Sequence, residues 1–301
     1  MKILILGTGY VGSEIASSLS KNHIVTCIDH GNNFSDFNHK LKNIKLVKGE
    51  IQNKNLIKDF SKDVDLICYC INTGGVVDCM KNPKLYKKIN IDDFEELLES
   101  IENKNCHFLL LSTSFVYSDY EKNLESSIPN PLTLYGKFRL EQESLLIKSN
   151  LPYTILRMSN IYGHQNFHVS KFNNVIDKFI SNIFSNQEIF LYGDGKQLVD
   201  FVHIDNFLKI LNQIIDDKSE NEIYNISNEF RLSISDIANN IKNIAETDYN
   251  ISVQINKSDD NTPLANIPNA STSKIQKKFL WKNSQNMNLE LLRMFENIKN
   301  S

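Results

Sequence analysis

Gly7-Thr8-Gly9-Tyr10-Val11-Gly12 follows directly on the apolar run Ile3-Leu4-Ile5-Leu6, and this junction decides the fold of the chain. A second apolar run, residues 24–28, ends in Asp29. A strand, a glycine turn, a helix, a second strand and an acid, in this order, are the fingerprint of a dinucleotide-binding βαβ unit. The alternative is a glycine turn in an unrelated α/β protein, which the complete pattern disfavours.

Each part of the glycine turn has a physical role in this interpretation. Gly7 permits the tight turn, and Gly9 lets backbone N–H groups approach a pyrophosphate. Gly12 allows the helix to pack closely on the strand. Tyr10 and Val11 begin this helix, whose N-terminus faces the phosphates with its positive dipole end. We therefore assign all five residues to cofactor binding.

Asp29 selects among dinucleotides. Its carboxylate would accept hydrogen bonds from the adenosine ribose hydroxyls and repel a 2′-phosphate. Residues 30–33 contain no arginine that could bind such a phosphate. The sequence thus predicts NAD as the cofactor and disfavours NADP.

Strands and helices alternate through the first half of the chain, which predicts an α/β protein with a Rossmann-type, doubly wound parallel sheet. Further strands are expected at 44–47, 64–71, 106–111, 153–158 and 189–192, and helices near 56 and at 91–101, 134–148, 175–183, 206–215 and 234–245. We expect a dinucleotide-binding domain over 1–165 plus about 197–227. A smaller α/β C-terminal substrate lobe is expected over about 166–196 plus 228–301.

Composition excludes several classes of protein. The 301 residues carry a formal charge of −3, which argues against nucleic acid or an anionic membrane as partner. No apolar run approaches the roughly 20 residues of a membrane span. Five cysteines, an odd number, lie mostly in apolar stretches and suggest reduced thiols in the cytoplasm. No metal site is expected, because Cys68/Cys70 and His164/His168 lack further ligands at a suitable spacing.

Three residues are candidates for the catalytic chemistry. Thr113 follows the strand at 106–111, at the sheet edge where parallel-sheet proteins bind ligands. Tyr135 begins the next helix, and Arg139 lies one turn later on the same face. A neighbouring cation favours a phenolate, which can take a proton from an alcohol while hydride leaves the same carbon.

These motifs together resemble the extended short-chain dehydrogenase/reductase family, also called the NAD-dependent epimerase/dehydratases. The resemblance covers almost the whole chain and rests on stretches that include 7–12, 112–117, 135–139, 157–163, 193–195, 200–205 and 280–282.

The resemblance implies roles for individual residues. It makes Tyr135 the acid/base and lets Thr113 bind the reacting oxygen. Glu50 and Ile51 would lie beside the adenine. Asn160 would contact the pyrophosphate of a nucleotide sugar. The family also implies a homodimer formed through the helices at 91–101 and 134–148.

Departures from the family pattern affect the expected chemistry. Arg139 stands where lysine is usual. It keeps the charge and can still bind the cofactor through a hydrogen bond to the nicotinamide ribose, but it cannot release a proton. Val199 stands where an arginine often holds substrate phosphate. Ser114 and Phe115 replace the Asp-Glu pair of sugar 4,6-dehydratases, which argues against dehydration.

The remaining candidates belong to the substrate site. Ser114 follows Thr113 at the same sheet edge. Lys171, Lys196 and Arg231, together with backbone N–H groups, are expected to hold the diphosphate in place of the missing arginine.

The sequence thus predicts NAD(H)-dependent hydride transfer at C4 of a nucleotide-activated sugar, by a 4-epimerase or a 4-keto-sugar reductase. Two alternatives remain open. The substrate could be a phosphate-free, hydroxysteroid-like alcohol, since arginine is scarce. Because of Arg139, the protein could also be a sensor that binds NAD without turnover.

Overall fold

The computed structural model describes residues 1–31, 43–118, 122–163, 174–217, 221–258, 265–282 and 286–299. In this part of the chain, seven strands form the central sheet. Every neighbouring pair in this sheet is parallel. In spatial order the strands are β10 (Glu222–Ile226), β6 (Tyr153–Met158), β5 (His107–Thr113), β4 (Leu66–Tyr69), β1 (Lys2–Leu6), β2 (Ile24–Asp29) and β3 (Ile44–Lys48).

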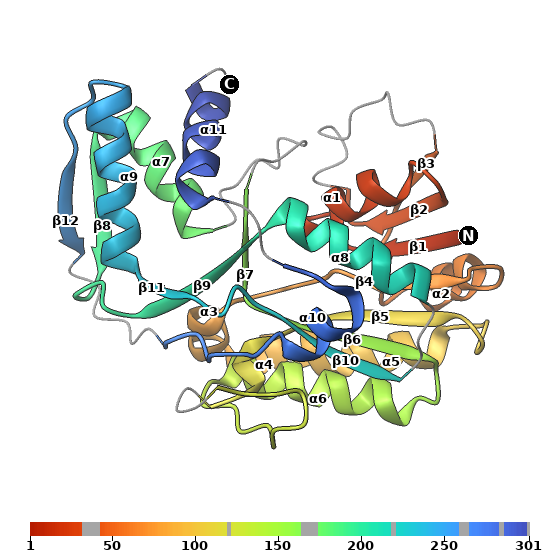
Figure 1. Ribbon diagram of the computed structural model, residues 1–301. Helices are drawn as coiled ribbons and strands as arrows, with labels where there is room; N and C mark the ends of the chain where they lie inside the picture. The colour runs from red at the N-terminus through yellow and green to blue at the C-terminus, as the bar shows by residue number, and fades with distance from the viewer. Residues whose placement is uncertain are drawn as a thin grey trace.

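Helices cover both faces of this sheet (Figure 1). One face carries α1 (Tyr10–Leu19), α8 (Ile204–Asp217) and the short α10 (Ser273–Phe279). The other carries α2 (Lys54–Ser61), α5 (Asp93–Ser100) and α6 (Leu134–Lys148). Before α5 the chain forms α3 (Val76–Lys81), α4 (Pro83–Lys87) and one π-helical turn, η2 (Lys88–Asp92).

The pleat of β1 explains the two-sided core. Ile3 and Ile5 point into the apolar cluster beneath α1 and α8. Leu4 and Leu6 point into the cluster on the opposite face. Because successive strand residues face opposite sides, a strand covered on both faces must be apolar at every position. The α/β, Rossmann-type fold class predicted from the alternation is confirmed.

A smaller lobe has its own apolar cluster. It contains α7 (Val175–Asn186), β8 (Glu188–Tyr192), α9 (Ile234–Asp248), β12 (Gln254–Ser258) and α11 (Met287–Lys299), with β8 and β12 paired in parallel. A three-stranded sheet of β11 (Arg231–Ser233), β9 (Leu198–His203) and β7 (Asn160–Tyr162) runs between the lobe and the central sheet (Figure 1).

In the central sheet, the last residue of β5, Thr113, is followed by a 3₁₀ turn, η3 (Ser114–Val116).

Some elements match the sequence-based expectation and others differ. The predicted strand at 153–158 and helix at 134–148 are confirmed to the residue. The helix predicted from 91 belongs to a longer helical stretch that begins at Val76, where Asp78 Oδ2 accepts from the Gly75 N–H at 3.0 Å. The strand β10 was not predicted, although it forms the sheet edge next to β6.

The segment around α10 lies on the central sheet, whereas the sequence places all of 228–301 in the lobe. Ile275 and Trp281 bury their side chains in the cluster beneath α1 and α8. Trp281 also donates to the carbonyl oxygen of Asn206 at 3.2 Å. Apolar burial against an element far away in the sequence thus returns this segment to the larger unit.

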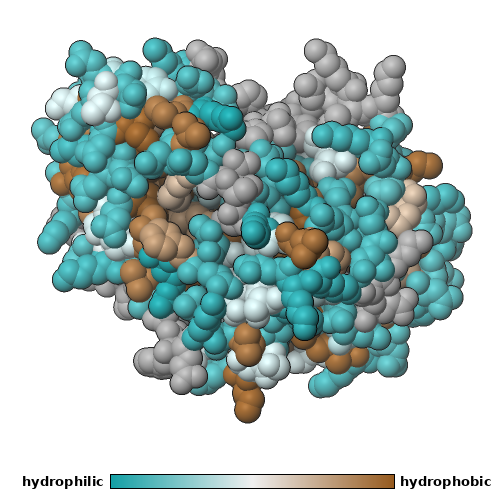
Figure 2. All heavy atoms as spheres, in the orientation of Figure 1, coloured by the Kyte–Doolittle hydropathy of each residue, from teal (hydrophilic) through white to brown (hydrophobic). Residues whose placement is uncertain are grey.

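The surface in the view of Figure 2 is mostly hydrophilic, with apolar residues in small separate patches. Among the described residues, no helix has the length and apolar character needed to cross a membrane. The same residues contain no cluster of three or more His, Cys, Asp or Glu side chains that could hold a metal ion.

Candidate active site

A cavity of about 730 Å³ lies at the carboxyl ends of the central strands. This is the edge at which parallel sheets bind ligands. The sequence-predicted residues that line it are Gly7, Gly9, Tyr10, Val11, Asp29, Glu50, Ile51, Thr113, Tyr135, Arg139 and Asn160. The fold therefore brings the predicted cofactor residues and the predicted proton-transfer residues into one space.

The glycine turn has the geometry that a bound pyrophosphate requires. Gly7 has a φ of +92°, and a Cβ there would lie 2.8 Å from Ile71. A Cβ at Gly12 would lie 2.1 Å from the Gly7 carbonyl oxygen, so the helix packs on the turn only without a side chain. Gly9 has open space around it and begins α1 without a capping side chain. The first N–H groups of α1 are left for an anion.

Asp29 ends β2 and is fixed by the backbone around it. Its Oδ2 accepts from the Thr8 N–H at 2.7 Å, and its Oδ1 accepts from the Gly31 N–H at 3.2 Å. The His30 imidazole lies 3.0 Å from Oδ1. A carboxylate has about four acceptor positions, so these three contacts leave one for a ribose hydroxyl. The turn and Asp29 together fit an NAD molecule.

Thr113 and Tyr135 are positioned by neighbouring elements. Thr113 is the last residue of β5, and its Oγ1 accepts from the Phe115 N–H at 3.3 Å. Tyr135 lies in the first turn of α6, which Thr133 caps by accepting from the Gly136 N–H at 3.0 Å. The Phe115 and Tyr135 rings meet edge to face, with centroids 5.9 Å apart. The aromatic contact and the helix cap restrict where the phenol can point.

The guanidinium of Arg139 is held by the turn that follows β4 and by Gln142 of α6. The side chain is 1% exposed. Its Nη1 and Nη2 donate to the Ile71 carbonyl at 3.4 and 3.3 Å, and Nη1 donates to Gln142 Oε1 at 2.8 Å. Nη2 also donates to Asn72 Oδ1. The Cζ atom lies 5.4 Å from the centre of the Tyr135 ring, a distance at which a cation is attracted to the π-face.

Other predicted residues lie outside the cavity lining. Lys196 is 82% exposed and pairs with Asp194 at 3.1 Å, because the tight turn around it directs its side chain to solvent. Arg231 donates to the Ile267 carbonyl at 3.1 Å. Ser114 is fully buried in the 3₁₀ turn after β5. Gly12 packs α1 on the turn, and Lys171 lies outside the described residues.

Sequence reasoning missed several residues that line the cavity. Asn72 lies just beyond β4 and Phe115 just beyond β5, so both satisfy the rule that ligands bind at carboxyl ends of strands. Applying that rule to every strand would have identified them. Ile267 and Asn174 come from distant parts of the chain, and no local pattern marks them.

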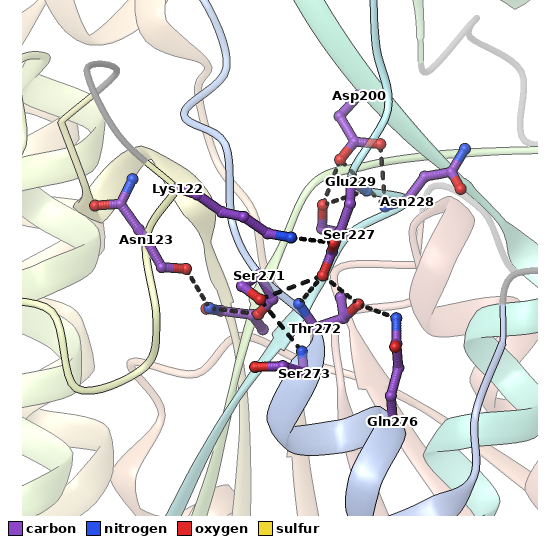
Figure 3. A network of polar contacts seen from close by, with 11 residues as sticks. Lys122, Asn123, Asp200, Ser227, Asn228, Glu229, Ser271, Thr272, Ser273 and Gln276 are labelled. Carbon is purple, nitrogen blue, oxygen red and sulfur yellow. Dashed lines mark hydrogen bonds and ion pairs between the residues drawn. The ribbon is translucent and has the colours of Figure 1, made fainter.

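A polar network joins β9 to the residues after β10 and to the start of α10 (Figure 3). Asp200 accepts from the Ser227 hydroxyl and, at 3.4 Å, from that of the cavity-lining Ser159. Burial raises the pKa of Asp200, although these hydrogen bonds oppose the shift. Glu229 accepts from the Thr272 hydroxyl at 2.8 Å, just before α10. The network ties β9 to the segment that follows β10 and, through Glu229, to the start of α10.

Comparison with known proteins identifies the family of the chain. The sequence profile of the NAD dependent epimerase/dehydratase family matches residues 3–227. A dTDP-D-glucose 4,6-dehydratase of Dictyostelium discoideum is 29% identical over 273 residues, covering 81% of this chain and 62% of the relative. A putative UDP-glucose 4-epimerase of Methanocaldococcus jannaschii is 27% identical over 245 residues, covering 78% of this chain and 79% of the relative.

The fold has close counterparts among solved structures. A UDP-glucuronic acid 4-epimerase from Bacillus cereus, in complex with UDP-glucuronic acid and NAD, superposes with a TM-score of 0.83. It is 24% identical, and the match covers 100% of this chain and 99% of that one. The chain therefore belongs to the NAD dependent epimerase/dehydratase family, within the extended short-chain dehydrogenases/reductases, and is by this membership an NAD-dependent enzyme, as its motifs predicted.

Proposed function

We propose that the protein transfers hydride between NAD(H) and C4 of a nucleotide-activated sugar, as a 4-epimerase or a 4-keto-sugar reductase. One observation carries the proposal. A single cavity joins the glycine turn and Asp29 to Thr113 and Tyr135, so cofactor and substrate would meet beside a group that can move a proton. The epimerases from M. jannaschii and B. cereus support the choice of C4.

The residues of this chain have distinct roles in that chemistry. Bound NAD would supply the acceptor for the hydride of the sugar carbon and, once reduced, the donor that returns it. Tyr135 takes the proton of the C4 hydroxyl as the hydride leaves, which yields a ketone, and gives the proton back when hydride returns. Thr113 donates a hydrogen bond to the same substrate oxygen. A reductase uses only the return half, with the Tyr135 proton and one hydride forming the alcohol.

The wall next to Tyr135 argues against 4,6-dehydration. Elimination of water requires an additional acid and base near the sugar. Phe115 presents an aromatic ring to Tyr135 there, and Ser114 is fully buried. Neither side chain can perform acid–base chemistry at neutral pH, so we propose that the chain lacks the dehydratase activity of its Dictyostelium relative.

We also propose that the enzyme prefers NAD to NADP. Asp29 holds a negative charge where the ribose of the adenosine would lie, and a 2′-phosphate there would be repelled. This preference is tested by measuring the dissociation constants of NAD and NADP, and the constant for NAD should be the smaller one. Equal affinities would contradict the role of Asp29.

A phosphate-free alcohol is the second candidate substrate. Arg139 is the only lysine or arginine in the described part of the cavity lining, and its terminal nitrogens already bond to protein acceptors. This favours a substrate without a diphosphate. Thermal stabilisation by UDP, dTDP, GDP or CDP would support the sugar nucleotide, and no response to any of them would support the alcohol.

The decisive experiment follows the reaction itself. The purified protein with NAD is incubated with UDP- and dTDP-hexoses, and the products are identified by NMR. Interconversion of C4 epimers indicates an epimerase, whereas consumption of NADH by a 4-keto sugar indicates a reductase. The matched control is Tyr135→Phe, which keeps the contact with the Phe115 ring and removes the proton donor. Activity equal to wild type in this variant would overturn the mechanism.

The family resemblance also implies an assembly of two chains. We propose a homodimer formed through α5 and α6, which pack against each other on one face of the sheet. Light scattering of the purified protein should give twice the chain mass of 34.6 kDa. A monomer would remove the proposal.

A further inference from the structure

We propose that the exposed face of the helical stretch from Pro83 to Ser100 binds a second copy of this chain in antiparallel orientation, with opposite charges at the two ends of the stretch holding the copies in register. This arrangement rests on the proposed homodimer and is independent of the proposed reaction. α4, η2 and α5 follow one another without interruption and form the stretch. It packs beside α6 on one face of the central sheet (Figure 1).

The order of charges along this stretch reverses from one end to the other. Counted forward from Pro83, the second, fifth and sixth residues are lysines. Counted backward from Ser100, the second, fifth and sixth residues are glutamates. These residues are Lys84, Lys87, Lys88, Glu95, Glu96 and Glu99, and all of them are exposed. A copy of the stretch turned end for end therefore brings a glutamate opposite every lysine.

This order of charges is unfavourable within a single chain. The first N–H groups of a helix carry a partial positive charge, and its last carbonyl groups carry a partial negative charge. Lys84 and Lys87 lie near the positive end, where the side chain of the N-cap residue Asn82 makes no capping hydrogen bond. Glu99 lies in the last turn of α5, which contains no basic residue. Each end of the stretch thus places like charges together.

Ion pairs within the chain compensate only part of these charges. Lys88 Nζ lies 2.6 Å from Asp93 Oδ1, and Glu96 Oε2 lies 3.5 Å from Lys54 Nζ. The side chains of the stretch that form no ion pair with any residue that the structure describes are those of Lys84, Lys87, Glu95 and Glu99. Two positive charges at one end and two negative charges at the other are therefore available to a partner.

A second copy supplies the missing charge at both ends at once. Two identical chains related by a two-fold axis repeat every contact, so that residue i meets residue j and j meets i. An axis that crosses the stretch between Ile91 and Asp92 brings Lys84 opposite the partner's Glu99, and the symmetry repeats this pair at the other end. The two macrodipoles then also run antiparallel. An unrelated protein would need the same reversed charge order by coincidence, so charge complementarity points to a second copy.

Two charge-reversed variants test this register. Lys84→Glu with Lys87→Glu places glutamates at both ends of the stretch, and Glu95→Lys with Glu99→Lys places lysines at both ends. Each variant alone should dimerise with a dissociation constant about 100-fold above that of wild type, because like charges meet at both ends. An equimolar mixture of the two variants should form a heterodimer with a constant close to that of wild type, since opposite charges meet again.

Sedimentation velocity over a dilution series measures the dissociation constants, and native mass spectrometry with one variant isotope-labelled identifies the heterodimer. The matched control is Lys209→Glu with Lys257→Glu, which changes the net charge by the same amount at exposed positions of α8 and β12. This control should dimerise like wild type and should not pair preferentially with the variant that carries the new lysines. Circular dichroism verifies that each variant is folded.

Weak dimers of each variant alone, together with recovery of the dimer in the mixture, support the antiparallel pairing. Dimers of unchanged strength in both variants overturn it and leave the proposed homodimer standing. Variants that dissociate and do not recover in the mixture also overturn it. A monomeric wild type overturns the pairing together with the homodimer and leaves the face to a different protein, whereas the proposed reaction is decided separately by the products formed from nucleotide sugars.

Discussion

Replacing Arg139 by lysine should destabilise the protein while keeping a cation beside Tyr135. In wild type, Nη1 and Nη2 bond to the Ile71 carbonyl, Gln142 Oε1 and Asn72 Oδ1 from a side chain that is 1% exposed. Lysine carries all its donors on one atom and cannot span acceptors that a planar fork reaches. At least one acceptor must lose its partner.

The size of the effect depends on which acceptor is lost. Asn72 is exposed, so water can replace the donor there. Gln142 is fully buried and cannot be hydrated. A buried acceptor without a donor costs about 1–3 kcal/mol. At about 2–4 °C per kcal/mol, the melting temperature of Arg139→Lys should fall by about 2–12 °C.

Urea denaturation and calorimetry of the two proteins measure this difference. The matched control is Lys137→Arg, the reverse exchange at an exposed position of the same helix, which should stay within about 0.5 kcal/mol of wild type. Arg139→Lys should retain NAD binding, because no cofactor residue on α1 or β2 is touched. A free energy of unfolding equal to that of wild type would refute the account of Arg139 as a buried, multiply bonded group.

Three further predictions concern catalysis, cofactor binding and pH. Tyr135→Phe should lower turnover by about 10²–10⁴-fold with unchanged NAD affinity, since only proton transfer is lost. NMR of the products measures turnover and calorimetric titration measures NAD affinity; a large loss of affinity would contradict this prediction. Asp29→Ala should weaken NAD binding by about 10–100-fold, which is the contribution of one charge-assisted hydrogen bond. The affinity for NADP should fall by a smaller factor. An equal loss of affinity for both dinucleotides would show that Asp29 does not determine the selectivity. Burial raises the pKa of Glu229, but hydrogen bonds from Lys122 and Thr272 outweigh this effect, so its pKa is lowered from the ordinary 4.5. Glu229 therefore stabilises the fold above that pH, and its contribution is lost as the pH falls below it. Glu229→Gln should lower stability at neutral pH and flatten this acid dependence in urea titrations, whereas Glu99→Gln, at an exposed site, should do neither.

Local patterns were enough to predict which residues line the end of the cavity where we propose that the cofactor binds. The apolar run of β1, the glycine turn and Asp29 lie within 30 residues of one another, and each has a requirement that a few residue types meet. Gly12 must lack a side chain because a Cβ would collide with the Gly7 carbonyl. Thr113 and Tyr135 were placed by the rule that carboxyl ends of parallel strands share an edge. Such constraints are written in neighbouring residues and can be read without a structure.

Only the tertiary structure decided where the charged side chains point and where the last segments pack. The same positive charge serves different purposes at Arg139, whose terminal nitrogens bond to buried acceptors, and at Lys196, which points to solvent beside Asp194. The return of β10 and α10 to the central sheet depends on apolar contacts across tens to hundreds of residues. The bond between Tyr135 and Asn72 joins two elements 63 positions apart. Periodicity reports which face of an element is buried, but it does not report its partner, because that choice is made by packing among many distant segments at once.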